Sequence, residues 1–464
     1  MRFFDCSQFL KPEQVQQPLP SNKAIYKKTL SIAMPSTIES VLISMISAVD
    51  MMMVGSIGAD AIASVGITNQ PKFIILAMIL SLNVGVTVVV SHRKGENNRQ
   101  AANQTLLQAW MISAFLSLIL STLGFIYARE IVVLAGATNE YADMAALYFK
   151  TIMVGNFFYS MSLTINAAQK GCGNTKIAMK TNIVANLVNL TFNFLLINGI
   201  WFFPRLGVFG AAIATSMGNV VAFMMSILSL RDPDGFLHWT AKNHQWKFDR
   251  KTLKDLYKIA SSAFAEQVFL RIGFFTYSKT VATLGMVAFA THNICMNLLN
   301  LSFSFGDGLS VATSSLVGQS LGAKRKDLAM IYSKTTQRLG NICGIVLGII
   351  MITLRYQLMN LFTNDPVIIQ NGANVVIIIA CTMYFQITQV VTYGCLRSAG
   401  DVKFTAMLSL LSVTIVRPFL TYLFCFPLNM GLIGAWISLF LDQFVRYTGS
   451  RLRHRQGKWM HIEI

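Results

Sequence analysis

Long apolar runs, separated by short polar segments, extend along almost the whole chain. Examples are the runs IILAMILSLNVGVTVVV, AWMISAFLSLILSTLGFIY and ICGIVLGIIMITL. An α-helix of about 20 apolar residues crosses the hydrocarbon core of a bilayer and satisfies its own backbone hydrogen bonds. The pattern therefore predicts an all-α membrane protein with many transmembrane helices.

The pattern predicts twelve spans in two groups of six. They cover residues 30–55, 62–91, 103–128, 140–166, 176–199, 207–230, 256–283, 287–317, 331–355, 367–394, 403–426 and 430–449. We therefore expect a cytoplasmic leader (1–29), an N-terminal lobe (30–230), a cytoplasmic linker (231–255), a C-terminal lobe (256–450) and a cytoplasmic tail (451–464). The leader lacks the apolar core and the cleavage site of a signal peptide.

Composition agrees with this interpretation. The 464 residues are 54% hydrophobic and 12% charged, whereas soluble proteins have about 25% charged residues. The net charge of +18 comes from basic residues confined to particular loops, so we expect no nucleic-acid partner. The seven cysteines show no CxxC or other metal-ligand spacing, and we expect no metal site and no cofactor.

The positions of lysine and arginine predict the orientation in the membrane. Of the 38 Lys and Arg, 30 fall in the leader, the linker, the tail and the loops on the same side, while three fall in the loops on the other side. Basic residues collect in cytoplasmic loops. Both termini are therefore predicted to be cytoplasmic, and the chain is expected in the cell membrane.

The two lobes are related by a repeat. Adding 227 to Glu39, Gly95 and Gly173 gives Glu266, Gly322 and Gly400. After the fifth span the offset is 224, which carries GVFGAA at 207–212 onto GLIGAW at 431–436. Parallel repeats of this kind are related by an axis along the membrane normal, and secondary transporters bind substrate where such repeats meet. The repeat predicts a substrate cleft between the lobes.

Several stretches resemble the MATE (multidrug and toxic compound extrusion) antiporters. They are AVDMMMVGSIGADAIASVG in the first span, ATHNICMNLLNLSFSFGDGLSVATSSLVGQSLGA in the eighth, and CLRSAGD, VRPF and IGAWISLFLDQFVR near the end. The resemblance extends from about residue 28 to 450. It implies twelve helices in two lobes, an outward-facing cavity, and export of organic cations driven by inward H⁺ or Na⁺.

Acidic residues deep in apolar spans are the first candidates for coupling sites, because a carboxylate in a bilayer is costly unless it is paired or protonated. Four were selected: Glu39, Asp50, Glu266 and Asp307. Each could instead fix helix packing through a salt bridge. The repeat places Glu266 at the position of Glu39, whereas Asp50 has Tyr277 as its counterpart. Glu39 and Asp50 share one face of the first span, about 16 Å apart.

The resemblance implies a functional role for particular residues. In MATE proteins of one large group an essential acid occupies the position of Glu266. Arg271 lies about 140° around the same helix from Glu266 and need not pair with it directly, while Asp307 is expected at about the depth of Glu266. A cluster of the three residues would have a net charge of −1. The fifth span carries four amides, Asn182, Asn186, Asn189 and Asn193, which helix packing alone could explain.

The resemblance also implies that Asn189 and Asn193 join Asp50 in a cation or proton site. The second of these positions is often Asp in the family. Gln386 stands where related sodium-coupled members carry an Asp, which lowers the expected capacity for sodium in the second lobe.

We therefore predict a monomeric antiporter of amphipathic organic cations, coupled to H⁺ more than to Na⁺. Glu266 is the main exchange site in this prediction, and Glu39 assists it across the cleft. The expected partners of the protein are the transported organic cations and membrane lipid. We find no catalytic motif such as HExxH or GxSxG, so an enzyme is not expected. The alternative is a lipid or oligosaccharide flippase of the same superfamily, which more often has fourteen spans and a cavity rich in Arg and Lys.

Overall fold

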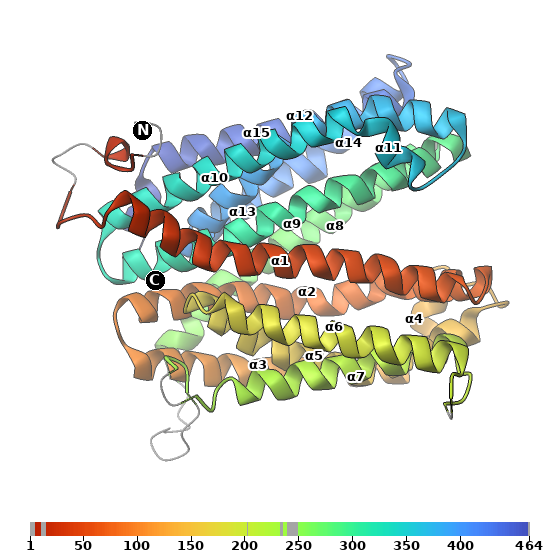
Figure 1. The fold of residues 1–464 in the computed structure, drawn as a ribbon, viewed down its shortest axis with the longest axis horizontal. Helices are drawn as coiled ribbons and strands as arrows, with labels where there is room; N and C mark the ends of the chain where they lie inside the picture. The colour runs from red at the N-terminus through yellow and green to blue at the C-terminus, as the bar shows by residue number, and fades with distance from the viewer. Residues whose placement is uncertain (1–4, 11–14, 202, 233–234, 239–248, 463–464) are drawn as a thin grey trace. The chain divides into compact units, whose positions relative to one another are not determined.

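The computed structural model describes residues 5–10, 15–201, 203–232, 235–238 and 249–462. Among these residues, helices are the only regular secondary structure (Figure 1). The elements are η2 (Ser7–Phe9), α1 (Asn22–Gly55), α2 (Ala59–Gly95), α3 (Arg99–Ile126), α4 (Ala128–Leu134), α5 (Ala142–Gly171), α6 (Thr175–Asn198), α7 (Gly207–Leu228), α8 (Arg250–Ala282), α9 (Met286–Gly322), α10 (Lys326–Thr353), α11 (Arg355–Asn360), α12 (Pro366–Ser398), α13 (Val402–Ser409), η4 (Leu410–Val416), α14 (Arg417–Cys425), α15 (Gly431–Arg455) and η5 (Lys458–His461).

The predicted all-α membrane fold is confirmed. Eleven predicted spans each coincide with one long helix, and the span 403–426 coincides with the continuous series α13, η4 and α14. By length and composition, seven of these helical segments in the described chain could cross a membrane: α1, α2, α3, α7, α10, α12 and the α13–α14 series. The remaining long helices are α5, α6, α8, α9 and α15, of which α8 and α15 are the least hydrophobic. These five helices carry most of the candidate charged and amide side chains.

The chain divides into two compact units. Unit 1 comprises Met1–Thr37 and Ser261–Ile464, and unit 2 comprises Ile38–Ala260. Both divisions fall inside a helix, the first within α1 two residues after Pro35 and the second within α8. Part of the predicted linker 231–255, namely residues 233–234 and 239–248, lies outside the described residues.

Unit 2 is a bundle in which α2, α3, α5, α6 and α7 run alongside one another (Figure 1). Its core includes the fully buried side chains of Phe149 and Met153 on α5. Small residues allow close helix contacts, as is common between membrane helices. A Cβ added at Gly171 would lie 2.8 Å from the carbonyl oxygen of Thr87, so the end of α5 touches the backbone of α2.

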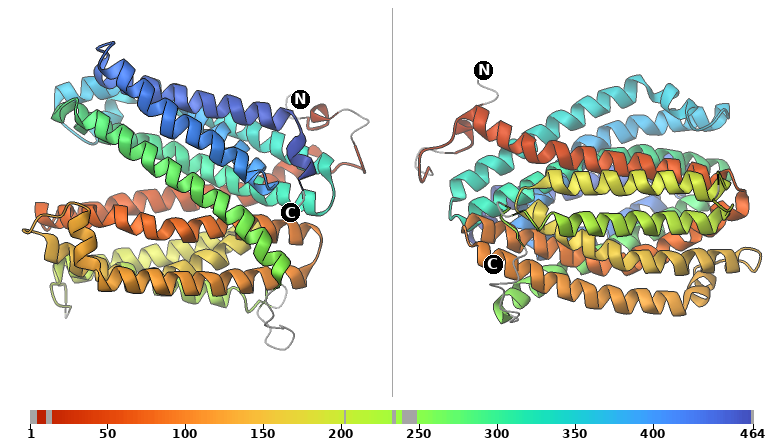
Figure 2. Two further views of the ribbon diagram at one scale, coloured as in Figure 1. Left: turned by 180° about the vertical axis from the view of Figure 1, so that it is seen from behind. Right: turned by 60° about the horizontal axis from the view of Figure 1, so that its bottom comes forward.

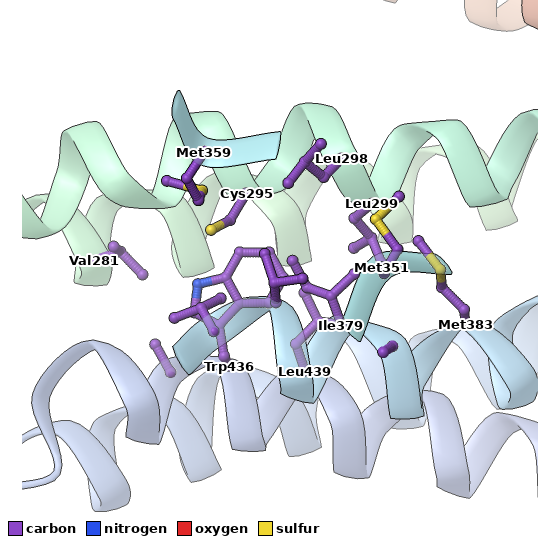
Figure 3. Close-up of a cluster of buried hydrophobic side chains, with 14 of the residues drawn as sticks. Val281, Cys295, Leu298, Leu299, Met351, Met359, Ile379, Met383, Trp436 and Leu439 are labelled. Carbon is purple, nitrogen blue, oxygen red and sulfur yellow. The ribbon is translucent and has the colours of Figure 1, made fainter. Parts of the chain in front are cut away.

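Unit 1 contains the second bundle, whose helices appear from two further directions in Figure 2. Its core is apolar and includes the fully buried indole ring of Trp436 from α15. Figure 3 shows this ring in the middle of the cluster, near Cys295 of α9 and Val281 of α8. The cluster fixes the spacing of the helices that carry the second set of candidate residues.

The described ends of the chain pack against the same region of unit 1, where α10 begins. Near the N-terminus, the side chain of Cys6 is buried and the carbonyl oxygen of Phe9 accepts a hydrogen bond of 3.0 Å from Lys334 Nζ. Near the C-terminus, Trp459 is fully buried and its Nε1 donates to the carbonyl oxygen of His454 at 3.0 Å. Both ends therefore belong to the folded unit.

The eleventh span changes its helical geometry in the middle. The seven residues of η4 form a π-helical segment directly before α14, which carries proline at its second position, Pro418. Proline has no N–H to donate to the preceding turn, and π-helical segments are often found at functional sites. A Cβ added at Gly273 would clash with the carbonyl oxygen of Val413. The backbones of α8 and η4 therefore touch.

Candidate functional site

Glu266 lies in a buried ion pair in unit 1. Arg397 Nη2 donates to Glu266 Oε1 at 2.7 Å, and Ser409 Oγ donates to the same oxygen at 3.1 Å. Thr405 Oγ1 donates to Oε2 at 3.2 Å. The Glu266 side chain is 3% exposed and that of Arg397 is 26% exposed. Both carboxylate oxygens therefore have partners, and the charge is balanced by one guanidinium group.

Glu39 has an equivalent environment in unit 2. Lys170 Nζ and Asn182 Nδ2 donate to Glu39 Oε1 at 2.8 and 2.6 Å. The Glu39 side chain is 3% exposed and that of Lys170 is 23% exposed. In the described part of the chain, Oε2 of Glu39 is buried and has no hydrogen-bond partner. The carboxylate is thus charge-balanced, but half of its hydrogen-bonding capacity is unused.

The two sites are copies related by the sequence repeat. The offset of 227 carries Glu39, Lys170 and Asn182 onto Glu266, Arg397 and Ser409. Each copy contains one acid, one base and one neutral donor to the same carboxylate oxygen, Oε1. The offset carries Ala178 onto Thr405, which explains why only Glu266 has a hydrogen bond on its second oxygen.

The basic residues are held in place by hydrogen bonds that are related by the same repeat. Thr87 Oγ1 donates to the carbonyl oxygen of Ala167 at 3.1 Å in unit 2, and Ser314 Oγ donates to that of Gly394 at 2.9 Å in unit 1. The offset of 227 carries Thr87 onto Ser314 and Ala167 onto Gly394. Each bond joins the last turn of one helix, α5 or α12, to its neighbour, α2 or α9. It fixes the turn that carries the basic side chain.

A tight turn then brings the third member of each site into place. Gly173 and Gly400 have φ values of 83° and 84°, a conformation that glycine adopts readily and other residues avoid. The chain reverses there and enters α6 or α13. The neutral donors Asn182 and Ser409 follow on these helices and reach the carboxylates.

Asp50 forms a separate cluster in unit 2 with two of the predicted asparagines. Asn193 Nδ2 donates to Asp50 Oδ1 at 2.9 Å. In the orientation that satisfies both amide atoms, Asn189 donates to the two Asp50 oxygens at 3.1 and 3.0 Å and accepts from Thr215 Oγ1 at 3.1 Å. Lys72 is the basic residue that acts on Asp50 electrostatically. Thr215 and Lys72 were not predicted, although Lys72 is the one basic residue of the second span.

The other predicted residues lie in different surroundings. Arg271 and Asp307 both have exposed side chains, whereas Glu266 is buried and its ion pair is with Arg397. Asp307 acts electrostatically on Arg397. Gln386 is fully buried, and its Oε1 accepts a hydrogen bond from Ser302 Oγ. The ion-pair partner of Glu266 is therefore Arg397, a residue that the sequence analysis did not select.

Sequence reasoning missed a buried acid within the last predicted span. Asp442 on α15 is fully buried, and its Oδ2 accepts from Arg417 Nη2 and, at 2.9 Å, from Arg446 Nη2. Asp442 Oδ1 accepts from Ser412 Oγ of η4. The spacing of four residues between Asp442 and Arg446 in one helix was the available signal. With two arginines and one aspartate, this cluster has a formal charge of +1.

The fold and these sites define an α-helical membrane protein built from two copies of one bundle. The family model MatE matches residues 35–195 and again residues 263–423. The chain therefore belongs to the MatE family of membrane transporters. The two matches are displaced by 228 residues, from 35 to 263, in agreement with the repeat found in the sequence.

Named relatives cover nearly the whole chain. The "Probable multidrug resistance protein NorM" of Thermotoga maritima is 25% identical over 460 residues, which are 99% of this chain and 97% of that protein. The "Uncharacterized transporter YisQ" of Bacillus subtilis is 27% identical over 435 residues, or 93% and 94% of the two chains.

A solved structure supports the same fold. It is that of a MOP superfamily transporter from Pyrococcus furiosus, and it matches with a TM-score of 0.87 and 18% identity over 95% of this chain and 97% of that one. That transporter is described as having a binding pocket of reverse polarity that suggests a different function.

Proposed function

We propose that this protein exports amphipathic organic cations by alternating access, in exchange for protons more than sodium ions. The observation that carries the proposal is the buried carboxylate of Glu266, repeated at Glu39, inside helices of a MatE chain. The multidrug resistance protein of Thermotoga maritima, similar along almost its full length, supports the same substrate class. In this proposal the protein is a monomer in the cell membrane with both termini cytoplasmic, and it needs no cofactor.

A buried carboxylate can couple two cations because it binds only one of them at a time. When Glu266 is ionised it attracts an organic cation, and when it is protonated it releases that cation. Glu39 assists in the same way in the first lobe. Asp50, with Asn189 and Asn193, provides a separate site at which charge can be exchanged. Glu266 is the main site in this proposal because both of its oxygens are held in position by the protein.

In this proposal the ion exchanged at Glu266 is a proton and not sodium, because the two ions need different numbers of ligands. A sodium ion needs several oxygen ligands at once, but Glu266 Oε1 already accepts from Arg397 and Ser409. A proton needs only one carboxylate oxygen. Gln386, fully buried and bonded to Ser302, adds no anionic ligand in the second lobe.

The alternative function is a flippase for lipid or oligosaccharide carriers. Two observations support it: the Pyrococcus furiosus transporter described as having a pocket of reverse polarity, and the formal charge of +1 around Asp442. Arg417 is fully buried, however, so its charge is directed at Asp442 and not at a ligand. Binding of a cationic dye and of a lipid diphosphate to the purified protein would separate the two functions.

The proposal is tested with purified protein in lipid vesicles loaded with a cationic fluorescent dye. A pH gradient and a Na⁺ gradient are imposed separately, and vesicles without protein provide the control. We expect the pH gradient to drive dye movement and the Na⁺ gradient to drive little. Movement driven only by Na⁺ would overturn the choice of ion, and none under either gradient would overturn the export of cations.

A further inference from the structure

We propose that Lys170 and Arg397 act as built-in counter-cations, which occupy Glu39 and Glu266 until a proton or a substrate cation replaces them. The inference rests on the proposed function and assigns the basic residues a part in it. They are positioning residues that tune how tightly each carboxylate holds a transported cation.

The geometry of each pair fits a competitor for one binding position. The basic nitrogen lies 2.8 Å from Glu39 Oε1 in one site and 2.7 Å from Glu266 Oε1 in the other. Each carboxylate is 3% exposed, but Lys170 and Arg397 are 23% and 26% exposed. The basic residue is thus the more exposed partner of each pair, and in this proposal it is the group that moves away from the carboxylate.

The repeat shows which property of these residues is shared. Lysine in one copy is arginine in the other, and the neutral donor Asn182 corresponds to Ser409. The number of hydrogen bonds differs as well, since only Glu266 has a partner on Oε2. Both copies keep a positively charged donor and a neutral donor to the same carboxylate oxygen, Oε1. The charge balance is therefore common to the two sites, although different residue types provide it.

Such a counter-cation gives the empty carrier a neutral site. An ionised carboxylate without a partner is costly in a buried position, so an empty site would otherwise have to hold a proton or a substrate. Because Arg397 is covalently attached, it returns to Glu266 whenever the transported cation leaves. It weakens substrate binding, and in return it makes release on the far side of the membrane faster.

The test replaces the charge and measures substrate affinity separately from turnover. Arg397→Gln and Lys170→Gln are compared with Arg453→Gln, which removes a similar ion pair. Arg453 lies 2.7 Å from Asp401 in the same unit as Arg397, with side chains 24% and 8% exposed. Dye binding to the purified protein gives Kd, and efflux from vesicles gives KM and kcat.

Loss of the competitor should tighten dye binding and slow release. For Arg397→Gln we expect Kd and KM to fall about tenfold, equivalent to about 1.4 kcal/mol, and kcat to fall as well. Lys170→Gln should show the same direction, Arg397→Lys should resemble the wild type, and Arg453→Gln should leave Kd unchanged. An unchanged Kd in both glutamine variants would overturn the proposal. If Arg397→Gln does not fold, Lys170→Gln decides the matter alone.

A purely structural ion pair makes a different prediction. In that case Arg397→Gln would lower Tm, but the Kd for the dye and the KM for efflux would stay at the wild-type values. That result in a folded variant would overturn the counter-cation role, and a fall in Kd and KM would support it. A wild-type protein that moves no cation would instead overturn the proposed function itself.

Discussion

Thr405 and Ala178 occupy equivalent positions in the two repeats, and only Thr405 donates a hydrogen bond to the buried glutamate of its own repeat. Glu39 Oε2 is buried without a partner in the described chain, whereas Glu266 Oε2 has Thr405 at 3.2 Å. This one difference makes Glu266 the more rigidly held carboxylate.

Thr405→Ala should lower thermal stability, because it leaves a buried carboxylate oxygen without its donor. The expected cost is about 1–3 kcal/mol, measured as a shift of Tm in detergent. Thr276→Ala is the matched control, since its hydroxyl bonds only to Ile272 O of its own helix at an exposed position. The reverse change, Ala178→Thr, should raise Tm if the new hydroxyl reaches Glu39. Equal Tm values for Thr405→Ala and its control would contradict the role given to this bond.

The cluster around Asp442 should be essential for stability. Asp442→Asn leaves Arg417 and Arg446 buried without a carboxylate, and loss of one partner from a buried pair costs about 3–5 kcal/mol. We expect a large fall in Tm. Asp143→Asn is the control, because the Arg129–Asp143 pair has side chains 60% and 80% exposed and exposed pairs contribute little. A similar Tm for the two variants would show that the buried cluster is unimportant.

His454 should make the stability of the protein sensitive to acid. It lies beyond the predicted last span, and its Nε2 is 2.8 Å from Ser333 Oγ. Burial, followed by the positive charges of Lys334 and Arg451, lowers the pKa of His454 from 6.5 to about 4. The unfolded chain therefore binds a proton at a pH where the folded chain does not.

Acid should lower the stability of the folded protein through His454. Above about pH 6.5 His454 is neutral in both states, and between pH 6.5 and 4 the free energy of unfolding should fall by about 3 kcal/mol in total. Tm measured across this range should therefore decrease more steeply for the wild type than for His454→Gln. Parallel curves for the two proteins would contradict a buried neutral histidine.

The predicted orientation can be tested by labelling introduced cysteines in whole cells. Lys324 precedes α10 and Glu140 precedes α5, and both side chains are exposed. In a background without reactive native thiols, an impermeant thiol reagent should label Glu140→Cys in intact cells and Lys324→Cys only after the cells are opened. The opposite result would reverse the orientation derived from the lysine and arginine distribution.

The sequence alone was sufficient to predict the long helices and the repeat. Apolar length predicts spans because every backbone polar group must be satisfied within the bilayer, and the offset linking Glu39 to Glu266 requires only the residue order. Helical periodicity placed Asn189 and Asn193 on one stripe of the fifth span, and their grouping with Asp50 came from the resemblance to the MATE antiporters. The inferences made from the residues alone depend on distances along one helix or along the chain.

The ion pairs could not be derived in this way, because they depend on which helices pack together. Arg397 lies 131 residues from Glu266 and was counted among the basic residues of a cytoplasmic loop. The repeat did contain a signal, since the offset from Glu39 to Glu266 also carries Lys170 onto Arg397. Asp442 was overlooked for a related reason, because its partners Ser412 and Arg417 come from another helix.

The most direct test of the account is gradient-driven dye efflux by Glu266→Gln in reconstituted vesicles. The glutamine keeps the shape of the side chain but can neither release a proton nor attract a cation by charge. A measurement of Tm first shows that the Glu266→Gln variant is folded. We then expect its pH-driven efflux to be abolished. Glu39→Gln should lose less efflux, and Asp50→Asn should be impaired by a separate route in the first lobe. Efflux by Glu266→Gln at the wild-type rate under the same pH gradient would contradict the assignment of Glu266 as the main exchange site.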